Sequence, residues 1–350
     1  HAGVVEVLLD RGANPNAYDG VGRPPLLLAA ANGELEIVKL LIRKGANINI
    51  RTKEDGYGAL QIATSAGNSE ILAFLADSGA DLDLRDNEGA FPLIQAAASA
   101  KESCARILLD RRAPILSSTK SKNTAYLESA RTGTPELVKL FAERGANTKG
   151  TIGQGSTALH IAIELKNDKV IDAIIDTDAA LIELADDVSW TPLHRAASGN
   201  PFATKRLIAR GAVLDSRMST GATPLAIACR DNRLEEVELL IKAGASLDSS
   251  DNFGWGPIHY ATSKSNSDVL RMLVLHGANI NLQAKTGFSA FHMAAEYGFV
   301  DMMSLLLEIG GDAIDIDGKT KDGHTTIHIA ATHGKSDVIS FLVARGANVN

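Results

Sequence analysis

Histidine is the first residue type in this sequence whose spacing suggests chemistry. The chain contains nine histidines, and five of them stand two residues before an alanine in a recurring segment: His160, His194, His259, His292 and His328. Imidazoles can bind metal ions or transfer protons. Successive members of this row lie at least one repeat apart, which is too far for two of them to share one ion. We therefore interpret the row as structural, and we expect no metal site.

Two other stretches approach ligand-binding motifs without completing them. Residues 150–157 resemble a phosphate-binding loop, but Ser156 replaces the lysine that contacts phosphate, and no strand precedes the loop. Residues 315–318 read Asp-Ile-Asp-Gly, like the middle of a calcium loop. Ala313 and His324 occupy the first and last ligand positions there, and neither supplies a carboxylate. We interpret both stretches as polar turns and predict no cofactor.

The composition argues against several classes of function. The 350 residues are 45% hydrophobic and carry a net charge of −7, which disfavours nucleic-acid binding. No apolar run reaches the ~18 residues of a membrane span, and we expect no signal peptide. No activated nucleophile can be placed, so we predict that the chain is not an enzyme.

The two cysteines, Cys104 and Cys229, fall at helix positions that other repeats fill with Val or Ala. We expect both to be buried, unreactive thiols. Together with the absence of an Asn-x-Ser/Thr sequence, they favour a reducing, cytoplasmic setting, with the nucleus as the alternative.

An internal repeat organises the whole chain. One segment, Thr191-Pro192-Leu193-His194-Arg195-Ala196-Ala197, recurs with variations from end to end. The intervals between its first alanines, with Ser129 as one substitute, are 34, 33, 33, 33, 34, 32, 33, 33 and 36 residues. The aligned positions are Ala29, Ala63, Ala96, Ser129, Ala162, Ala196, Ala228, Ala261, Ala294 and Ala330. Such a period is typical of repeat architectures in which each unit packs on its neighbours.

Each repeat contains the signals for two helices and a turn. Thr is suited to cap the first helix, and Pro fits its first turn because that turn needs no N–H there. An apolar second helix begins about eight residues after the alanine, as at 37–42 and 237–241. A Gly-Ala-Asn-like tripeptide follows, and its glycine can adopt the left-handed conformation that ends a helix. The small paired alanines let neighbouring units approach closely.

This pattern resembles the ankyrin repeat over the whole chain. The resemblance implies an all-α solenoid of helix-turn-helix units with β-turn fingers in a curved right-handed stack, and it implies that the repeated histidine hydrogen-bonds within and between turns. We expect a single array over 1–350, with a partial repeat at 1–18. The ten further repeats are expected to start near residues 19, 53, 86, 119, 152, 186, 218, 251, 284 and 320. Because neither end has a polar capping repeat, we expect a fragment of a longer chain.

The repeat is least regular between about residues 113 and 188. Residues 112–124 lack both the helix-ending glycine and the finger glycine, and residues 176–180 replace Gly-Ala-Asn. We expect irregular stacking or a bend in this part of the array.

The residue just before the capping Thr carries the functional prediction. The resemblance implies that this place faces the concave groove and is free to vary, yet four of the ten residues there are aromatic. Exposed aromatic residues mark interaction sites. The alternative is that the rings lie on neighbouring fingers and stiffen the stack. With finger-tip and helix-end residues that should face the same way, the predicted partner-binding residues are Tyr57, Trp190, Phe253, Trp255, Phe288, Tyr297, His324 and His333.

We therefore predict a scaffold that binds a protein or peptide along its concave face and has no chemistry of its own. Trp190, Trp255 and Phe288 are the expected anchors. Two alternatives remain open: the regulatory or targeting arm of a larger enzyme or channel, and a mechanical spacer.

Overall fold

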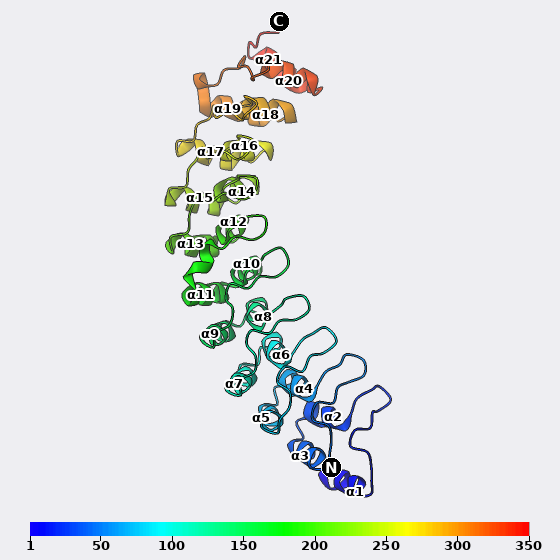
Figure 1. Ribbon diagram of the computed structural model, residues 1–350. Coiled ribbons are helices and arrows are strands. Elements are labelled where there is room, and N and C mark those ends of the chain that lie inside the picture. The colour runs from blue at the N-terminus through cyan, green and yellow to red at the C-terminus, as the bar shows by residue number, and fades with distance from the viewer. Residues whose placement is uncertain (350) are drawn as a thin grey trace. The chain divides into compact units, whose positions relative to one another are not determined.

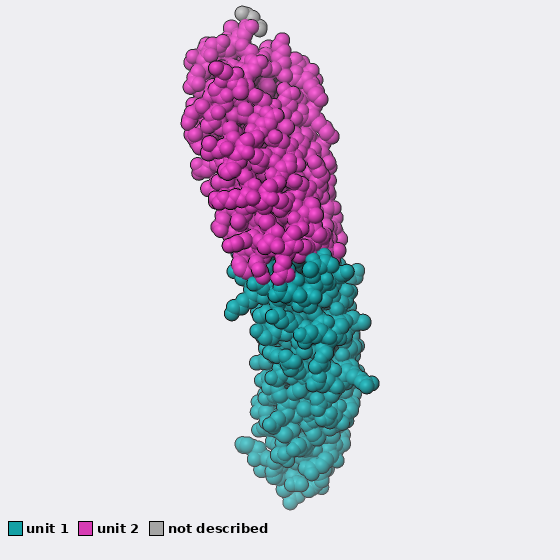
Figure 2. All heavy atoms as spheres, turned by 90° about the vertical axis from the view of Figure 1, so that its left-hand side faces the viewer, with its two compact units in different colours: residues 1–181 teal, residues 182–350 magenta. Residues whose placement is uncertain are grey.

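The computed structural model describes residues 1–349, and Asn350, the last residue of the predicted array, lies outside the described residues. Over the described residues the chain forms 21 α-helices, two 3₁₀ helices and a few isolated β-bridges, without a sheet. The chain divides into two compact units, which we call unit 1 (residues 1–181) and unit 2 (from residue 182), as coloured in Figure 2. An all-α repeat fold is thereby confirmed.

Unit 1 consists of short helices that come in pairs, with a turn of two or three residues inside each pair and a longer finger between pairs (Figure 1). The helix α1 stands alone before the first pair. The bounds are α1 Ala2–Asp10, α2 Pro25–Asn32, α3 Leu35–Arg43, α4 Ala59–Ala66, α5 Ser69–Asp77, α6 Pro92–Ala98, α7 Glu102–Asp110, α8 Ala125–Thr132, α9 Pro135–Glu143, α10 Ala158–Glu164 and α11 Asp168–Thr177.

Unit 2 repeats this arrangement, and the 3₁₀ helix η1 (Ala179–Glu183) contains the point of division. The remaining helices are α12 Pro192–Ala197, α13 Pro201–Ala209, α14 Pro224–Arg230, α15 Leu234–Ala243, α16 Pro257–Ser263, α17 Ser267–Leu275, α18 Ala290–Tyr297, α19 Val300–Gly310, η2 Gly311–Ala313, α20 Thr326–Thr332 and α21 Ser336–Ala344.

Within each unit, the first helices of the pairs form one row and the second helices form another. In unit 1, α2, α4, α6, α8 and α10 contact one another in order, and in unit 2, α12, α14, α16, α18 and α20 do the same. The motif alanines on these helices are buried, including Ala96, Ala196 and Ala261. Their small side chains allow the close approach that the sequence predicted.

Local capping chemistry sets where the first helices begin. The Thr191 hydroxyl accepts a hydrogen bond from the backbone N–H of His194, and Thr223 caps α14 in the same way. Pro192 and Pro224 occupy the first helical positions. A capping hydroxyl satisfies one of the N–H groups that a helix start leaves unpaired. The predicted roles of Thr and Pro are therefore confirmed at these helices.

We expect the substitution Thr223→Ala to destabilise the protein by about 1–2 kcal/mol, because the N–H of Ala226 loses its acceptor 3.3 Å away inside a buried turn. Urea unfolding followed by circular dichroism measures the change. Thr220→Ala, at an exposed position of the same finger, is the control and should change stability by less than about 0.5 kcal/mol. Equal losses in the two variants would contradict the capping role.

The irregular part of the sequence is accommodated by local changes in the backbone. Gly45 and Gly145 end their helices with φ of 86°, as predicted for the helix-ending glycine. Where that glycine is missing, Arg112 itself adopts φ of 65°, which is uncommon for a side chain with a Cβ atom. After α11, the helix η1 takes the place of the Gly-Ala-Asn turn.

Both cysteines are free and buried, as the sequence predicted. Cys104 lies in α7 and Cys229 in α14. Burial raises the pKa of both thiols. This shift disfavours the thiolate, which is the nucleophilic form.

Candidate functional site

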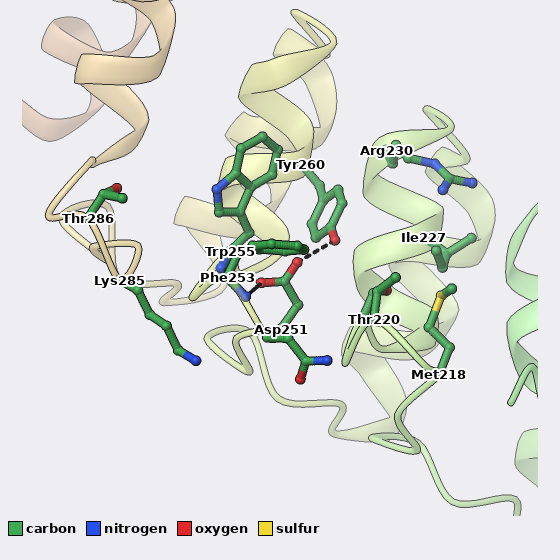
Figure 3. Close-up of a pocket in the computed structure, with 12 residues that line it drawn as sticks. Met218, Thr220, Ile227, Arg230, Asp251, Phe253, Trp255, Tyr260, Lys285 and Thr286 are labelled. Carbon is green, nitrogen blue, oxygen red and sulfur yellow. Dashed lines mark hydrogen bonds between the residues drawn. The ribbon is translucent and has the colours of Figure 1, made fainter. Parts of the chain in front are cut away.

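A pocket that combines aromatic walls with exposed side chains lies in unit 2, between neighbouring fingers. We call it the interfinger pocket (Figure 3). Its volume is about 590 Å³, within the range of pockets that hold small ligands or single large side chains. The fingers before α14, α16 and α18 and the helices α14 and α16 line it: Met218, Thr220, Ala222, Ile227, Arg230, Asp251, Asn252, Phe253, Trp255, Tyr260, Lys285 and Thr286.

A buried carboxylate fixes the central finger of this pocket. One oxygen of Asp251 accepts hydrogen bonds from the backbone N–H groups of Phe253 and Trp255, both at 2.8 Å. The other oxygen accepts the hydroxyl of Tyr260 at 2.7 Å, as drawn in Figure 3. Asp251 is only 6% exposed. The carboxylate therefore determines the position of both aromatic residues on the finger and ties that finger to α16.

The same device recurs in three other repeats but presents different side chains. Asp19 accepts from the N–H groups of Val21 and Arg23, Asp86 from those of Glu88 and Ala90, and Asp186 from those of Val188 and Trp190. A finger closed by aspartate is thus shared by several repeats. The aromatic content of the finger at residues 251–255 is particular to that repeat.

Three aromatic rings give the interfinger pocket its apolar walls. The Trp255 and Tyr260 rings meet edge to face, with centroids 5.6 Å apart and planes at 73°, which is a favourable aromatic geometry. Trp255 also stacks on His259, at 6.4 Å and 24°. Phe253, at the finger tip, is 66% exposed. Trp255 is therefore held by its neighbours, whereas Phe253 presents most of its ring to solvent.

Trp190 extends this apolar surface by one repeat. It packs against a buried cluster of Ala222, Ala226 and Ile227, and Met218 and Tyr260 pack against the same cluster. The Arg195 guanidinium lies over the indole, 4.8 Å from the ring centroid. We use the name aromatic surface for the continuous set formed by Trp190, Met218, Ile227, Phe253, Trp255 and Tyr260.

In three repeats the motif histidine connects one finger to the backbone of the next repeat. His259 Nδ1 accepts the backbone N–H of Gly256 at 3.1 Å, and its Nε2 donates to the carbonyl of Phe288 at 3.2 Å. The Nε2 of His194 and of His292 contacts the carbonyl of Ala222 or Gly318 in the same way. Burial lowers the pKa of the His259 and His292 imidazoles, although these carbonyls oppose the shift. The neutral imidazole is therefore the structural form.

The structural interpretation of the histidine row agrees with these contacts. Each of these rings bonds to backbone of its own helix cap and, in the three cases above, to the next finger. Among residues 1–349, no group of three His, Cys, Asp or Glu side chains is arranged to hold a metal ion.

The other predicted partner-binding residues lie outside the interfinger pocket. Phe288 is half-buried, with its ring centroid 5.8 Å from that of His292. Tyr297 is exposed beside Phe299 at 5.6 Å, and His324 is exposed beside His328 at 6.3 Å. The remaining two are His333, whose Nε2 lies 3.5 Å from Glu296, and the half-buried Tyr57 of unit 1.

Sequence reasoning missed Tyr260, Met218, Ile227, Arg230 and Lys285 as lining residues. A signal for Tyr260 was present. It occupies the place directly before the motif alanine, where several repeats carry an aliphatic residue, as at Ile161 and Ile227. The larger or polar residues at that place are Gln95, Glu128, Arg195 and Tyr260. A second variable position therefore faces the fingers.

The corresponding surface of unit 1 is polar. A pocket of about 400 Å³ lies beside Glu128, Arg131 and Asn123. Burial raises the pKa of the Glu128 carboxyl, but hydrogen bonds from Arg131 and Asn123 outweigh it, and the pKa lies below its usual value. Glu128 and Arg131 already pair with each other in this pocket. A partner therefore gains less binding free energy here than on the aromatic surface of unit 2.

Over the described part of the chain, no helix combines the length and the apolar character that a membrane crossing requires.

Comparison with known proteins gives a family and several relatives. A family model described as ankyrin repeats (3 copies) matches residues 1–86, 127–218, 193–284 and 274–350. The transient receptor potential cation channel subfamily A member 1 of Homo sapiens is 26% identical over 219 residues, which make up 59% of this chain and 19% of that protein. Its Caenorhabditis elegans homolog is 28% identical over 131 residues, or 37% of this chain and 11% of that protein.

A third relative is not a channel by name. The B-cell lymphoma 3 protein homolog of Mus musculus is 31% identical over 111 residues, which make up 30% of this chain and 25% of that protein. The chain thus spans a quarter or less of the length of each of these three relatives.

Proposed function

This chain belongs to the ankyrin repeat family, and from that premise we propose that it holds a protein or peptide partner on the aromatic surface of unit 2 without performing chemistry of its own. Ankyrin repeats generally serve as protein-interaction modules and are typically non-catalytic. The observation that carries the proposal is the interfinger pocket, in which the exposed Phe253 stands next to the fixed Trp255 and Tyr260.

A rigid finger supports such binding. Asp251 and His259 hold the backbone of residues 253–256 before a partner arrives. Binding therefore loses little backbone entropy, which is one of the main costs of association. Large aromatic side chains in a partly desolvated pocket are typical binding hot spots.

A randomised displayed-peptide library, selected on the full chain, tests this proposal. We expect the selected peptides to lose at least tenfold in affinity with Trp255→Ala or Phe253→Ala, measured by fluorescence anisotropy. Phe288→Ala, at the third predicted anchor beside the finger, should have a smaller effect. Leu275→Ala is the control, because Leu275 is 84% exposed on the second helix α17, away from the pocket.

Phe253→Ala distinguishes a loss of binding from a loss of folding. Its side chain is exposed and contributes little to the core, so the variant should stay folded. The proposal fails if selected peptides bind the Trp255 and Phe253 variants as tightly as the parent chain, or if selection yields no saturable binder.

The similarity to a cation channel supports a second candidate, in which this array is the regulatory or targeting arm of a larger channel protein. The alignment covers 59% of this chain but only 19% of the channel, as expected if the arrays alone are alike. Expression of the full-length protein and recording of membrane currents with and without the array would test this candidate. An unchanged current, or no current in either form, would exclude it.

A further inference from the structure

The charged groups that line the interfinger pocket determine which partner chemistry it fits. Three charged residues line it: Arg230, Asp251 and Lys285. The oxygens of Asp251 already accept three hydrogen bonds, and the residue is almost fully buried. Arg230 forms a paired contact with the carboxylate of Asp231, at 2.7 and 3.0 Å. Arg230 is therefore neutralised by Asp231, and the hydrogen-bonding positions of the Asp251 carboxylate are taken up inside the protein while it keeps its negative charge.

Lys285 is the remaining charge. It is exposed on the finger before α18, and its backbone N–H donates to the carbonyl of Phe253, so its position is tied to the aromatic finger tip. Among residues 1–349, no ion pair of the Lys285 ammonium is found. The rim of the pocket therefore carries one exposed ammonium group without an ion-pair partner, beside an apolar cavity (Figure 3).

We propose that the pocket binds a peptide segment in which a bulky uncharged side chain, such as Leu, Met or Phe, is adjacent to a carboxylate residue. The apolar side chain enters between Trp255, Tyr260 and Ile227, and the neighbouring carboxylate pairs with Lys285. This inference rests on the proposed function and names the partner chemistry of the same site. The volume of about 590 Å³ is sufficient for one large side chain and its flanking backbone.

An aromatic pocket with a carboxylate at its base could instead bind a cation, as in cages for methylated ammonium groups. The charges argue against that occupant. The Asp251 oxygens are occupied by the N–H groups of Phe253 and Trp255 and by the Tyr260 hydroxyl. The unpaired ammonium of Lys285 would repel a second cation in the same pocket. An uncharged side chain fits the apolar walls of the pocket, and an adjacent anion can pair with Lys285 at its rim.

Four fluorescein-labelled peptides with identical Gly-Ser flanks test the inference against the full chain by anisotropy at low ionic strength. Their central pairs are Leu-Asp, Leu-Asn, Leu-Lys and trimethyllysine-Asn. We expect Leu-Asp to bind about two- to fivefold more tightly than Leu-Asn, the range expected for an exposed ion pair, and Leu-Lys to bind more weakly than Leu-Asn. The preference should diminish as salt is added.

The substitution Lys285→Gln should abolish the difference in affinity between Leu-Asp and Leu-Asn. Lys205→Gln, an exposed lysine on the second helix α13, is the matched control and should preserve the preference. Tighter binding of trimethyllysine-Asn than of Leu-Asn would overturn the inference in favour of a cation cage. An equal affinity for Leu-Asp and Leu-Asn, or a preference that persists in Lys285→Gln, would overturn the role of the carboxylate.

The proposed function and the inferred partner chemistry are contradicted by different results. If library-selected peptides bind through Trp255 but none of the four designed peptides binds, the inferred anchor chemistry is wrong and the proposed function stands. If neither group of peptides binds, the proposed function itself is wrong.

Discussion

The double variant His259→Gln/His292→Gln is expected to remain folded at an acidic pH at which the parent chain has lost much of its stability. In the parent, the Nδ1 atom of His259 accepts a backbone N–H, so a proton on that nitrogen breaks the bond and places two donors face to face. Burial holds the pKa of both imidazoles below their ordinary value of 6.5.

The sign of the pH effect follows from linkage. As the pH falls below 6.5, the unfolded chain takes up protons before the folded chain does, and the free energy of unfolding decreases. The contribution of each histidine is therefore fully present above pH 6.5 and is lost as the pH falls from 6.5 through the lowered folded-state pKa. Glutamine has no such proton equilibrium.

The chain itself shows that glutamine can replace this histidine. Gln61 stands at the equivalent place of α4, where its Oε1 accepts the N–H of Gly58 at 2.9 Å and its Nε2 donates to the carbonyl of Ala90 at 2.9 Å. Gly58 and Gly256 are both glycine caps, so the match to His259 is close. We expect the double variant to lie within about 1 kcal/mol of the parent at pH 7.5, since its hydrogen bonds are kept.

Urea unfolding at pH 7.5 and at pH 5 measures the effect as the difference between the double variant and the parent, which cancels the titration of the carboxylates. His259→Ala is the contrasting variant. It should lose about 2–4 kcal/mol at pH 7.5, because two backbone groups lose their partner and a cavity forms. If the double variant and the parent lose stability in parallel between the two pH values, the histidines are not the acid-sensitive groups.

The second large effect is expected from Asp251→Ala, with a loss of about 2–4 kcal/mol. The substitution removes the acceptor of two finger N–H groups and of the Tyr260 hydroxyl at once. Hydrogen bonds to a charged group contribute about 1.5–3 kcal/mol each. Water can replace some of the lost bonds in the variant, so the expected loss is smaller than their sum. Burial and the bond to Asp251 raise the pKa of Tyr260, so the phenol remains a donor near neutral pH.

Asp251→Asn is the matched control, because its amide oxygen still accepts both backbone N–H groups. It should retain most of the stability, with a loss of about 1 kcal/mol. Hydrogen exchange at the amides of Phe253 and Trp255 provides the local measurement and should accelerate strongly only in Asp251→Ala. Equal exchange rates in the two variants would show that the carboxylate does not fix the finger.

Features that depend on residues close in sequence were predictable. The start of α12 follows from Thr191 and Pro192, and the end of α3 from Gly45, because each of these residues acts on backbone within one turn of itself. The buried motif alanines follow from the repeat in the same way. The left-handed Arg112 was not predictable as a conformation, since its side chain disfavours it and the surrounding repeat imposes it.

The site depended on the combination of two variable positions in each repeat rather than on either position alone. Trp190 and Trp255 occupy equivalent places in their repeats, and sequence reasoning treated them as equivalent anchors. Their surroundings differ because the residue before the motif alanine is Arg195 in one repeat and Tyr260 in the other. The Arg195 guanidinium lies over the first indole, whereas Tyr260 leaves the second one at the wall of a pocket. Such differences appear only when both variable positions are considered together.

The placement of these two indoles also has an optical consequence. They are the only tryptophans of the chain, and both lie in unit 2. Selectively excited tryptophan emission is therefore sensitive to occupancy of the aromatic surface and to unfolding of unit 2. Unfolding of unit 1 should leave this emission unchanged, because neither tryptophan lies in unit 1. A comparison of fluorescence with circular dichroism in one denaturation experiment thus resolves the two units without any added label.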